Sequence, residues 1–385
     1  MHALTPELFH GALEVQPTDR GVRPHRLPPA VRTRDADAQL LSAQAQPSGV
    51  RVVVATTARR LDLGVHATRQ ALGGAQRLRG AVDVLVDGEL LTTHVLAGGD
   101  LVDVDLRTGT VTTTRGPGDH VVVDDLPGGD KVVEFWLPHL EQVDVTGLSA
   151  DAPVGPVALP GPLWVHHGSS LSHGSNASSP TRTWPAIAAR AAGVRLQNLG
   201  FGGSALVDPF LARVVRDLPA DLVSVKLGIN VVGADAMRRR TFVAAVHGFL
   251  DTVRDGHPTT PLLLLSPLHC ALHEDTPGPG SLDPEALGRG ELRFTATGRP
   301  GDTAGGRLTL RVVRDALREV VAARADDPHL HHLDGLDLFG EADEREHPLP
   351  DALHLDTAAH SLVGRRFTDL AFGAGGPFAG AAPGR

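Results

Sequence analysis

Four short stretches of this sequence carry the kinds of side chain that acyl transfer requires. In chain order they are "GSSL" with Ser170, "GFGG" ending at Gly203, "GIN" ending at Asn230, and "DALH" with Asp351 and His354. A serine hydroxyl is a weak nucleophile until a base takes its proton, and histidine changes protonation state most easily near neutral pH. Fixed N–H donors can then stabilise the oxyanion that forms on the attacked carbonyl. The four stretches therefore predict a nucleophile, oxyanion donors, a base and its orienting acid.

The alternation of strand and helix patterns in the C-terminal half explains how the four stretches, which are far apart in the sequence, would meet. Apolar runs alternate with helical patterns there, which is typical of a doubly wound parallel α/β sheet. We expect strands over 162–167, 194–200, 221–228, 261–267 and 330–335, and helices over 184–193, 205–218, 234–256, 308–326 and 357–372. Such sheets bind ligands outside the carboxyl ends of their strands. Three of the stretches follow strands and the fourth precedes the last helix, so we expect them to converge at one edge.

The N-terminal half has a different pattern, which sets the expected domain boundaries. Residues 1–148 read as short Val-, Leu- and Thr-rich runs of period two, separated by turn signals such as "DG" and "LPGGD". This favours an antiparallel β-sandwich or jelly roll, acting in packing or in shaping the substrate site. The Pro/Gly-rich stretch "SADAPVGPVALPGPL", residues 149–163, is expected to be a linker. Residues 164–385 then form the catalytic α/β domain.

The four stretches resemble the motifs of the GDSL, or SGNH, hydrolase family across residues 163–373. "GSSL" matches Gly-Asp-Ser-Leu, "GFGG" the second motif, "GIN" Gly-x-Asn and "DALH" Asp-x-x-His, in the family's order. The resemblance implies a flavodoxin-like, three-layer α/β fold, with a doubly wound parallel sheet between two layers of helices. It also implies a serine esterase that uses no cofactor. Ser170 would be the nucleophile, His354 the base and Asp351 its orienting acid. The oxyanion hole would consist of the N–H groups of Ser170 and Gly203 and the amide of Asn230. The N-terminal half, mainly through "VVEFWLP", resembles the β-sandwich found in a bacterial esterase branch of this family.

Three positions depart from the family pattern. Ser169 stands where the motif has Asp, Val231 where an Asp usually follows Gly-x-Asn, and Leu355 where Pro often follows the histidine. None supplies a reacting atom, so the departures affect the substrate class more than the mechanism. We expect hydrolysis of a small, acetyl-like O-acyl ester of a carbohydrate or secondary metabolite. Two alternatives stay open: an acyltransferase with the same residues, and a non-catalytic ligand-binding protein on the same scaffold.

Other chemistries fit the sequence less well. "GFGGSA" matches the dinucleotide fingerprint Gly-x-Gly-x-x-Ala, but the next strand has no acidic residue at its end to hold a ribose. The pattern Gly-x-Ser-x-Gly of ordinary α/β-hydrolases is absent. "HCALHE" suggests a metal, yet its spacing matches no strong zinc pattern. We therefore expect no metal site, and assign His269 and Cys270, together with His173, to the wall of the substrate pocket.

Several other polar residues have structural explanations. His166 and His167 are expected to pack at the end of a strand. Lys226, in an otherwise apolar strand, is expected to extend its ammonium group to solvent. His360 is expected to face the surface of its own helix rather than the serine.

Bulk composition limits the class of partner and the compartment. The 385 residues carry a formal charge of −9, so the composition lacks the excess of positive charge that is typical of nucleic-acid-binding proteins. One cysteine excludes an internal disulfide. The start, "MHALTPELFHGALEV", lacks the features of a signal peptide, and no membrane-length apolar run follows. We expect a cytoplasmic protein acting on a small molecule, and the sequence does not indicate its oligomeric state.

Overall fold

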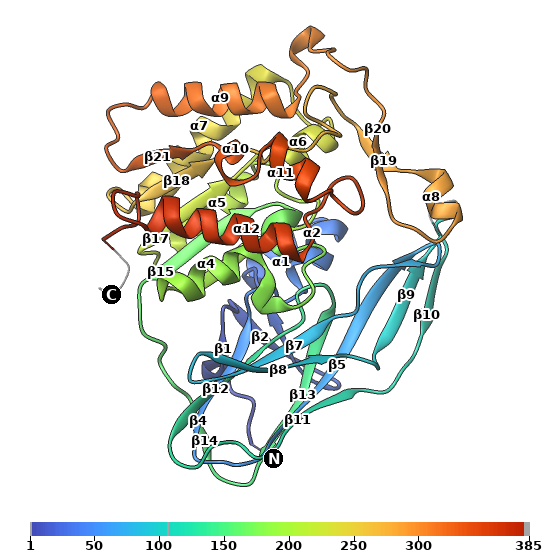
Figure 1. The fold of residues 1–385 in the computed structure, drawn as a ribbon, viewed down its shortest axis with the longest axis vertical. Coiled ribbons are helices and arrows are strands. Elements are labelled where there is room, and N and C mark those ends of the chain that lie inside the picture. Colours follow the sequence, from blue (N-terminus) through green and yellow to red (C-terminus); the bar gives the residue numbers. More distant parts are fainter. Residues whose placement is uncertain (1, 106–107, 381–385) are drawn as a thin grey trace. The chain divides into compact units, whose positions relative to one another are not determined.

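The computed structural model describes residues 2–105 and 108–380, and the chain divides into two compact units (Figure 1). The first, which we call the β unit, contains the described residues up to Leu159 together with Ser178–Arg182. The second, the α/β unit, contains Pro160–Ala177 and the described residues from Thr183 onward. The chain therefore leaves the α/β unit for five residues shortly after "GSSL" and then returns to it.

The β unit is built from two sheets. One has the order β1-β4-β12-β7-β8 with β14 beside β4, and the other β10-β9-β5-β13-β3-β2 with β6 and β11 beside β5. The strands are β1 (Phe9–His10), β2 (Glu14–Thr18), β3 (Gly21–His25), β4 (Arg51–Thr56), β5 (Leu61–Leu72), β6 (Ala75–Gln76), β7 (Ala81–Val86), β8 (Glu89–Val95), β9 (Asp100–Val104), β10 (Val111–Thr114), β11 (Asp119–Val123), β12 (Lys131–Trp136), β13 (Gln142–Ala150) and β14 (Val154–Gly155). The pairings are antiparallel except that of β5 with β9. Their inward side chains form one apolar core that includes Val52, Leu63 and Phe135. This confirms the predicted β-sandwich class.

The β unit differs from the sequence prediction in two places. Two short helices, α1 (Pro29–Arg34) and α2 (Ala38–Gln44), lie between β3 and β4, where no helix was expected. Asp37 caps the second by accepting the N–H of Leu40 at 2.8 Å. The stretch expected as a linker over 149–163 contributes the end of β13 and all of β14, which pairs with β4. Pairing along β4 satisfies the backbone polar groups of Val154 and Gly155, so this stretch belongs to the β unit as far as Leu159.

The α/β unit contains a parallel sheet of order β16-β15-β17-β18-β21. These strands are β15 (Leu163–Gly168), β16 (Arg195–Gly200), β17 (Leu222–Lys226), β18 (Leu262–Leu265) and β21 (Leu330–Leu333). Numbered within the unit, the order is 2-1-3-4-5, which is the flavodoxin-like arrangement predicted from the sequence. An antiparallel hairpin, β19 (Gly280–Leu282) and β20 (Phe294–Ala296), lies in a Gly/Pro-rich excursion after β18, over residues 276–306. The sheet changes direction of winding at β15, the strand that leads to Ser170.

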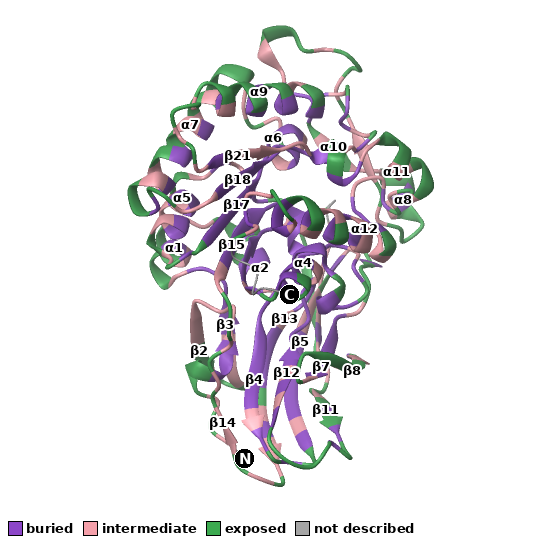
Figure 2. Ribbon diagram, turned by 60° about the vertical axis from the view of Figure 1, so that its left-hand side comes forward, coloured by how far each residue is buried: buried purple, intermediate pink, exposed green. Residues whose placement is uncertain are grey.

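Helices cover both faces of this sheet. The α-helices of the described part of this unit are α3 (Ser170–His173), α4 (Trp184–Ala192), α5 (Pro209–Asp217), α6 (Ile229–Gly233), α7 (Arg239–Gly256), α8 (Pro284–Gly288), α9 (Leu310–Ala322), α10 (Gly335–Leu338), α11 (Glu341–Glu346) and α12 (Thr357–Phe367), of which α8 lies between β19 and β20 and away from the sheet. Trp164 of β15 stacks on Phe367 of α12. His167, three positions later in the same strand, stacks on Phe249 of α7. Because strand side chains alternate between faces, α12 and α7 cover opposite faces. Figure 2 shows the strands buried between helices whose outer sides are exposed.

Local sequence signals explain where these helices begin and end. Pro185 lies in the first turn of α4, and Gly193 ends that helix with a φ of 66°, in the left-handed region that glycine adopts without strain. Asp356 caps α12 by accepting the N–H of Ala359 at 2.8 Å. Because α12 starts three residues after His354, this cap fixes the end of the loop that carries the histidine. No helix among residues 2–105 and 108–380 combines the length and apolarity needed to cross a bilayer.

Candidate active site

Glycines at two strand ends let Ser170 approach the sheet closely. A Cβ on Gly168, at the end of β15, would lie 2.3 Å from the Ser172 hydroxyl. A Cβ on Gly200, at the end of β16, would lie 2.6 Å from the backbone of Ser172 and His173. Larger residues would push α3 away, since atoms cannot approach so closely. The glycines thus seat α3, with Ser170 as its first residue, directly on the carboxyl edge of the sheet.

Ser170, His354 and Asp351 form a continuous hydrogen-bonded chain. The Ser170 hydroxyl donates to Nε2 of His354 at 2.9 Å, and Nδ1–H of His354 donates to Oδ2 of Asp351 at 2.7 Å. The other carboxylate oxygen accepts the backbone N–H groups of His354 and Leu353 at 2.7 and 3.1 Å. Burial raises the pKa of Asp351, but the hydrogen bonds and charge of His354 outweigh that effect and hold the pKa at about 2. The carboxylate is therefore ionised and orients the imidazole so that Nε2 accepts the serine proton.

Two residues that the sequence did not single out complete this arrangement. The Asn176 side-chain amide donates to Oδ2 of Asp351 at 3.2 Å, and Asn176 itself adopts a left-handed backbone with a φ of 67°. Phe294, on β20, meets the His354 ring edge to face at 5.3 Å, and its N–H donates to the Asp351 carbonyl at 2.9 Å. The Gly/Pro-rich excursion therefore packs against the loop that carries Asp351 and His354. A lone aromatic side chain in that excursion was the only sequence signal for this contact.

The predicted oxyanion residues lie on the turns that follow β16 and β17. Gly203 has a φ of 73°, which glycine adopts without strain. The side-chain oxygen of Asn230, Oδ1, accepts the N–H of Ala205 at 3.1 Å, so the side-chain N–H₂ of Asn230 points away from that bond. Gly228, with a φ of 127°, makes the turn before Asn230, and a Cβ there would lie 2.6 Å from Val313. The hydrogen bond between Asn230 and Ala205 joins the two turns and fixes the orientation of the amide.

The three residues expected in the pocket wall all have internal partners. Nδ1 of the buried His173 accepts the N–H of Gly202 at 3.3 Å, which fastens the turn carrying Gly203. Nδ1 of His269 lies 2.6 Å from a Glu344 carboxylate oxygen. The buried Cys270 thiol donates to the Ala352 carbonyl at 3.6 Å, beside the Asp351–His354 loop. Burial, followed by the charge of Glu344, raises the pKa of Cys270 to about 12, so it stays a thiol.

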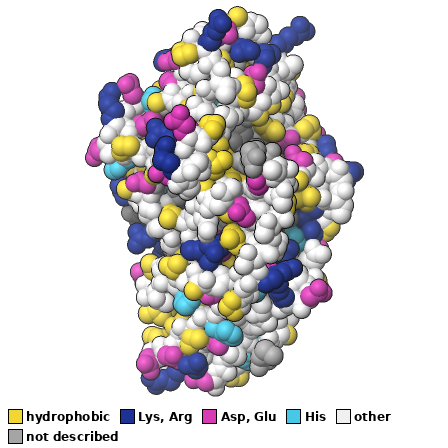
Figure 3. Space-filling view, turned by 90° about the vertical axis from the view of Figure 1, so that its right-hand side faces the viewer, with side chains coloured by type: hydrophobic (Ala, Val, Ile, Leu, Met, Phe, Trp, Pro, Cys, Tyr) yellow, Lys and Arg dark blue, Asp and Glu magenta, His cyan; other side chains and the backbone are white. Residues whose placement is uncertain are grey.

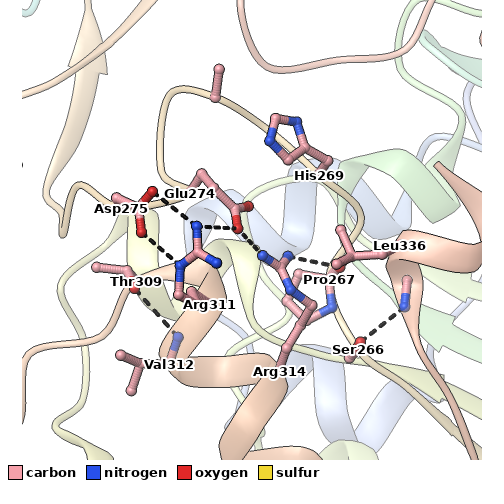
Figure 4. Close-up of polar contacts among 12 residues, drawn as sticks. Ser266, Pro267, His269, Glu274, Asp275, Thr309, Arg311, Val312, Arg314 and Leu336 are labelled. Carbon is pink, nitrogen blue, oxygen red and sulfur yellow. Dashed lines mark hydrogen bonds and ion pairs between the residues drawn. The ribbon is translucent and has the colours of Figure 1, made fainter. Parts of the chain in front are cut away.

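Ion pairs from α9 hold the loop that carries His269 and Cys270. Figure 4 shows Arg314 and Arg311 directed at Glu274 and Asp275. The buried Arg314 forms an ion pair with Glu274 and also donates to the Pro267 carbonyl at 3.2 Å. Arg311 donates twice to Asp275, at 2.8 and 3.1 Å. Because a buried charge is costly without a partner, the buried pair of Arg314 with Glu274 favours this conformation of the loop, whereas the exposed pair of Arg311 with Asp275 adds little.

Histidines outside the triad are packed in the interior. His166 joins the hydroxyls of Ser224 and Ser172, each at 2.7 Å, and its burial lowers its pKa well below the ordinary value. His360 is fully buried, so the expectation that it faces its helix surface is wrong. Its Nδ1 accepts the Trp184 N–H at 3.4 Å and its Nε2–H donates to the Ser175 carbonyl at 3.0 Å. These histidines are neutral; His166 contacts α3 itself through Ser172, and His360 holds Ser175, which follows α3.

Lys226 also differs from expectation, because it is buried rather than extended to solvent. Its exposed fraction is 2%, and its ammonium group forms no hydrogen bond or ion pair with residues in the described part of the chain. β17 is a central strand, so the side chain at its end is covered by neighbouring elements. Burial, opposed only by the nearby Cys270, lowers the pKa of Lys226 from 10.5 to about 8. The protonated form is thus disfavoured in the folded state.

We expect Lys226→Met to stabilise the protein in a pH-dependent way. A fall in pKa from 10.5 to about 8 corresponds to about 3 kcal/mol, since a tenfold change in a protonation constant is about 1.4 kcal/mol. The folded pKa lies below the unfolded one, so this cost is complete below pH 8 and disappears as the pH rises to 10.5. Urea unfolding at pH 7 and pH 10.5 measures both values. Equal gains at the two pH values would refute the explanation.

The structure also bears on the alternative chemistries. The glycine turn after β16 continues as irregular backbone until α5 begins at Pro209, so it lacks the helix N-terminus that a dinucleotide site requires. Among the described residues, no group of three or more His, Cys, Asp or Glu side chains is arranged to hold a metal ion. On the face drawn in Figure 3, lysine and arginine side chains are interspersed with acidic ones.

Comparison with known proteins gives matches over both units. A sequence model of the GDSL-like lipase/acylhydrolase family matches residues 167–362, and a model of the SsfX3 N-terminal domain matches residues 8–146. The salicylyl-acyltransferase SsfX3 from a tetracycline biosynthetic pathway is 28% identical, with a TM-score of 0.76 over 94% of this chain and 93% of that one. A family two carbohydrate esterase from Clostridium thermocellum, in complex with cellohexaose, is 14% identical, with a TM-score of 0.55 over 85% and 93%. The second similarity concerns the fold alone. No curated protein sequence matches the chain.

Proposed function

The chain belongs to the GDSL-like lipase/acylhydrolase family, and from this premise we propose that it cleaves small O-acyl esters through an acyl-enzyme on Ser170. The observation that carries the proposal is the hydrogen-bonded chain from the Ser170 hydroxyl through His354 to Asp351. Each member has the orientation that its role needs, with a hydroxyl facing an acceptor nitrogen and an N–H facing an ionised carboxylate.

The reaction follows from these contacts in two steps. His354 Nε2 takes the Ser170 proton as Oγ attacks the ester carbonyl carbon, and Asp351 stabilises the imidazolium. The tetrahedral intermediate collapses to the acyl-enzyme while the imidazolium returns its proton to the leaving alcohol oxygen. An acceptor hydroxyl then loses its proton to His354 and attacks the acyl-enzyme. The second tetrahedral intermediate collapses as the bond from the acyl carbon to Oγ breaks and the imidazolium returns its proton to Ser170. If the acceptor is water, the products are a carboxylic acid and free Ser170.

The oxyanion of each intermediate needs donors that are fixed before the reaction begins. We assign this role to the backbone N–H groups of Ser170 and Gly203 and to the side-chain amide of Asn230. The N–H of Ser170 opens α3, where helical residues have no intrahelical acceptor. Because Ala205 donates to Oδ1 of Asn230, the side-chain N–H₂ is the group that we assign to the substrate oxygen.

Asn230→Asp tests this assignment with little change in shape. The new carboxylate keeps an acceptor for Ala205 but replaces the N–H₂ donor with an oxygen, so it repels the oxyanion. We expect kcat for p-nitrophenyl acetate to fall by about 10²- to 10³-fold, the usual cost of losing one such donor. Steady-state kinetics at constant pH measures the change. An unchanged kcat would remove Asn230 from the oxyanion hole.

The preferred substrate class is a small acyl group on a carbohydrate or secondary metabolite. The fold similarity to carbohydrate esterases and the match to SsfX3 support this choice. A screen of acetylated sugars and aryl esters, with Ser170→Ala as the blank, tests it. Turnover confined to long-chain lipid esters would contradict it.

Acyl transfer to an alcohol is the second candidate function. It is favoured by the similarity to the acyltransferase SsfX3, which extends over nearly the whole of both chains. The two functions share the acyl-enzyme and differ in the second acceptor. Product analysis by mass spectrometry in the presence of competing alcohols separates them. A transferase gives the new ester at alcohol concentrations far below that of water, whereas a hydrolase gives only the acid.

A further inference from the structure

The hairpin of β19 and β20 touches both sides of the proposed reaction centre, and all of these contacts lie within the α/β unit. β19 packs against α6, the short helix that carries Asn230. The approach is close, because a Cβ on Gly278, just before β19, would lie 2.0 Å from the Val232 carbonyl oxygen. On the other side, the Phe294 N–H of β20 donates to the Asp351 carbonyl at 2.9 Å. The hairpin thus joins the turn of the proposed oxyanion donor to the loop of the proposed base.

Backbone hydrogen bonds hold Phe294 at a fixed place in this hairpin. Phe294 pairs with Leu282 across the two strands. Just outside that pair, the Asp283 N–H donates to the Arg293 carbonyl at 2.8 Å. The Phe294 side chain is half-buried, although its backbone is bonded on both sides. Part of an apolar ring therefore stays accessible at a position that the backbone fixes.

The contact of Phe294 with His354 determines which part of a substrate the ring can meet. The two ring centroids lie 5.3 Å apart, with their planes at 77°. In each half of the proposed reaction a proton passes between Nε2 of His354 and an alcohol oxygen, which must lie within hydrogen-bond reach of that nitrogen. The carbon substituent of the alcohol then lies beside the imidazole, whereas the acyl carbonyl oxygen faces the oxyanion donors. Phe294 is therefore placed to meet the alcohol rather than the acyl group.

We propose that Phe294 is a specificity-determining residue, which selects as acyl acceptor an alcohol attached to a ring with an apolar face. Packing of the two rings holds the acceptor hydroxyl at His354 and favours it over water. The acceptor oxygen bonds to the acyl carbon as its proton passes to Nε2. The bond from that carbon to Ser170 Oγ then breaks, and the proton returns to Oγ. This inference rests on the proposed acyl-enzyme and names the acceptor class of the same site.

The test is the partition of the acyl-enzyme between water and benzyl alcohol, with p-nitrophenyl acetate as donor. Chromatography gives the ratio of benzyl acetate to acetate. In Phe294→Ala we expect this ratio to fall by about tenfold, the size that loss of one aromatic contact produces. Both products arise from the same acyl-enzyme and the same base. A variant that only displaced His354, or that folded less completely, would slow both reactions alike, so an unchanged ratio would overturn the proposal.

Methanol and a neighbouring side chain supply the controls. Methanol has no ring, so the ratio of methyl acetate to acetate is expected to stay at the wild-type value in Phe294→Ala. Thr295→Ala alters the next residue of β20, whose side chain lies on the other side of the strand, and is expected to leave both ratios unchanged. Phe294→Leu keeps an apolar side chain without an aromatic face, and is expected to lower the benzyl ratio even if Phe294→Ala folds poorly.

Two further outcomes would count against the selection of a ring-bearing acceptor. Equal falls in the methyl and benzyl ratios would mean that Phe294 excludes water without binding the acceptor. Wild-type enzyme that releases p-nitrophenol but forms only acetate in benzyl alcohol would also overturn the proposal, while leaving the acyl-enzyme intact. Failure of the proposed function is a different result, namely Ser170→Ala with wild-type turnover.

Discussion

Replacing Ser170 with alanine is expected to lower kcat for p-nitrophenyl acetate by a factor on the order of 10⁶, as in other enzymes that lose their serine nucleophile. The hydroxyl oxygen is the atom that bonds to the acyl carbon, and this hydroxyl is the one that hydrogen-bonds to Nε2 of His354. Substrate binding and the oxyanion donors stay, so a small rate above that of water is expected to persist. Initial rates at high enzyme concentration, monitored by release of p-nitrophenol, measure both values.

The neighbouring Ser169 provides the control for this prediction. Its buried hydroxyl has no hydrogen-bond partner among the described residues, so Ser169→Ala is expected to keep wild-type kcat. A fluorophosphonate probe is expected to label the wild type and Ser169→Ala but not Ser170→Ala. Failure to label the wild type, together with absence of turnover, would instead favour a ligand-binding protein on the same scaffold.

Asp351→Asn is expected to lower kcat by about 10⁴-fold, because it reverses the proton arrangement on His354. The oxygen that accepts the two backbone N–H groups of Leu353 and His354 is held in place, so the new amide N–H₂ faces Nδ1 of His354. Nδ1 must then accept, and Nε2 carries the proton. In that tautomer His354 cannot take the proton from Ser170. Stopped-flow kinetics of acylation measures the loss at the affected step.

Asp356→Asn is the matched control, since this nearby carboxylate caps α12 and does not contact the His354 ring. Asparagine caps helices about as well as aspartate, so both Tm and kcat are expected to stay near the wild-type values. If Asp351→Asn retained wild-type acylation, His354 and Ser170 would act as a pair. Asp351 would then serve only to shape its loop.

The sequence predicted those parts of the fold that depend on local pattern. Period-two runs identified the sandwich, and the alternation of apolar strands with amphipathic helices identified the sheet. The family motifs then fell at strand ends, where a 2-1-3-4-5 sheet brings chain segments to one edge. Ser170 and His354 lie 184 positions apart in the sequence. They could be paired because each lies in a family motif, and the motifs occur in the family's order.

The sequence did not indicate contacts that depend on three-dimensional packing between ordinary residues. Asn176 lies 175 positions from Asp351, and an asparagine in a Ser/Asn-rich loop has no pattern that links it to a carboxylate. Phe294 meets His354 only because the excursion folds into a hairpin. Lys226 was expected at the surface because lysine usually is, but its strand is central in the sheet. Asp83 holds residues 96 and 98 positions later, in a segment that interrupts the α/β unit.

The most direct test of the central claim is the mass of the enzyme caught during turnover. Wild-type protein mixed with excess p-nitrophenyl acetate and quenched in acid within milliseconds is expected to gain the mass of one acetyl group. Peptide mapping is expected to place that group on Ser170, and Ser170→Ala is expected to show no adduct. An acetyl group on another residue during wild-type turnover, or an equal adduct in Ser170→Ala, would contradict the acyl-enzyme mechanism.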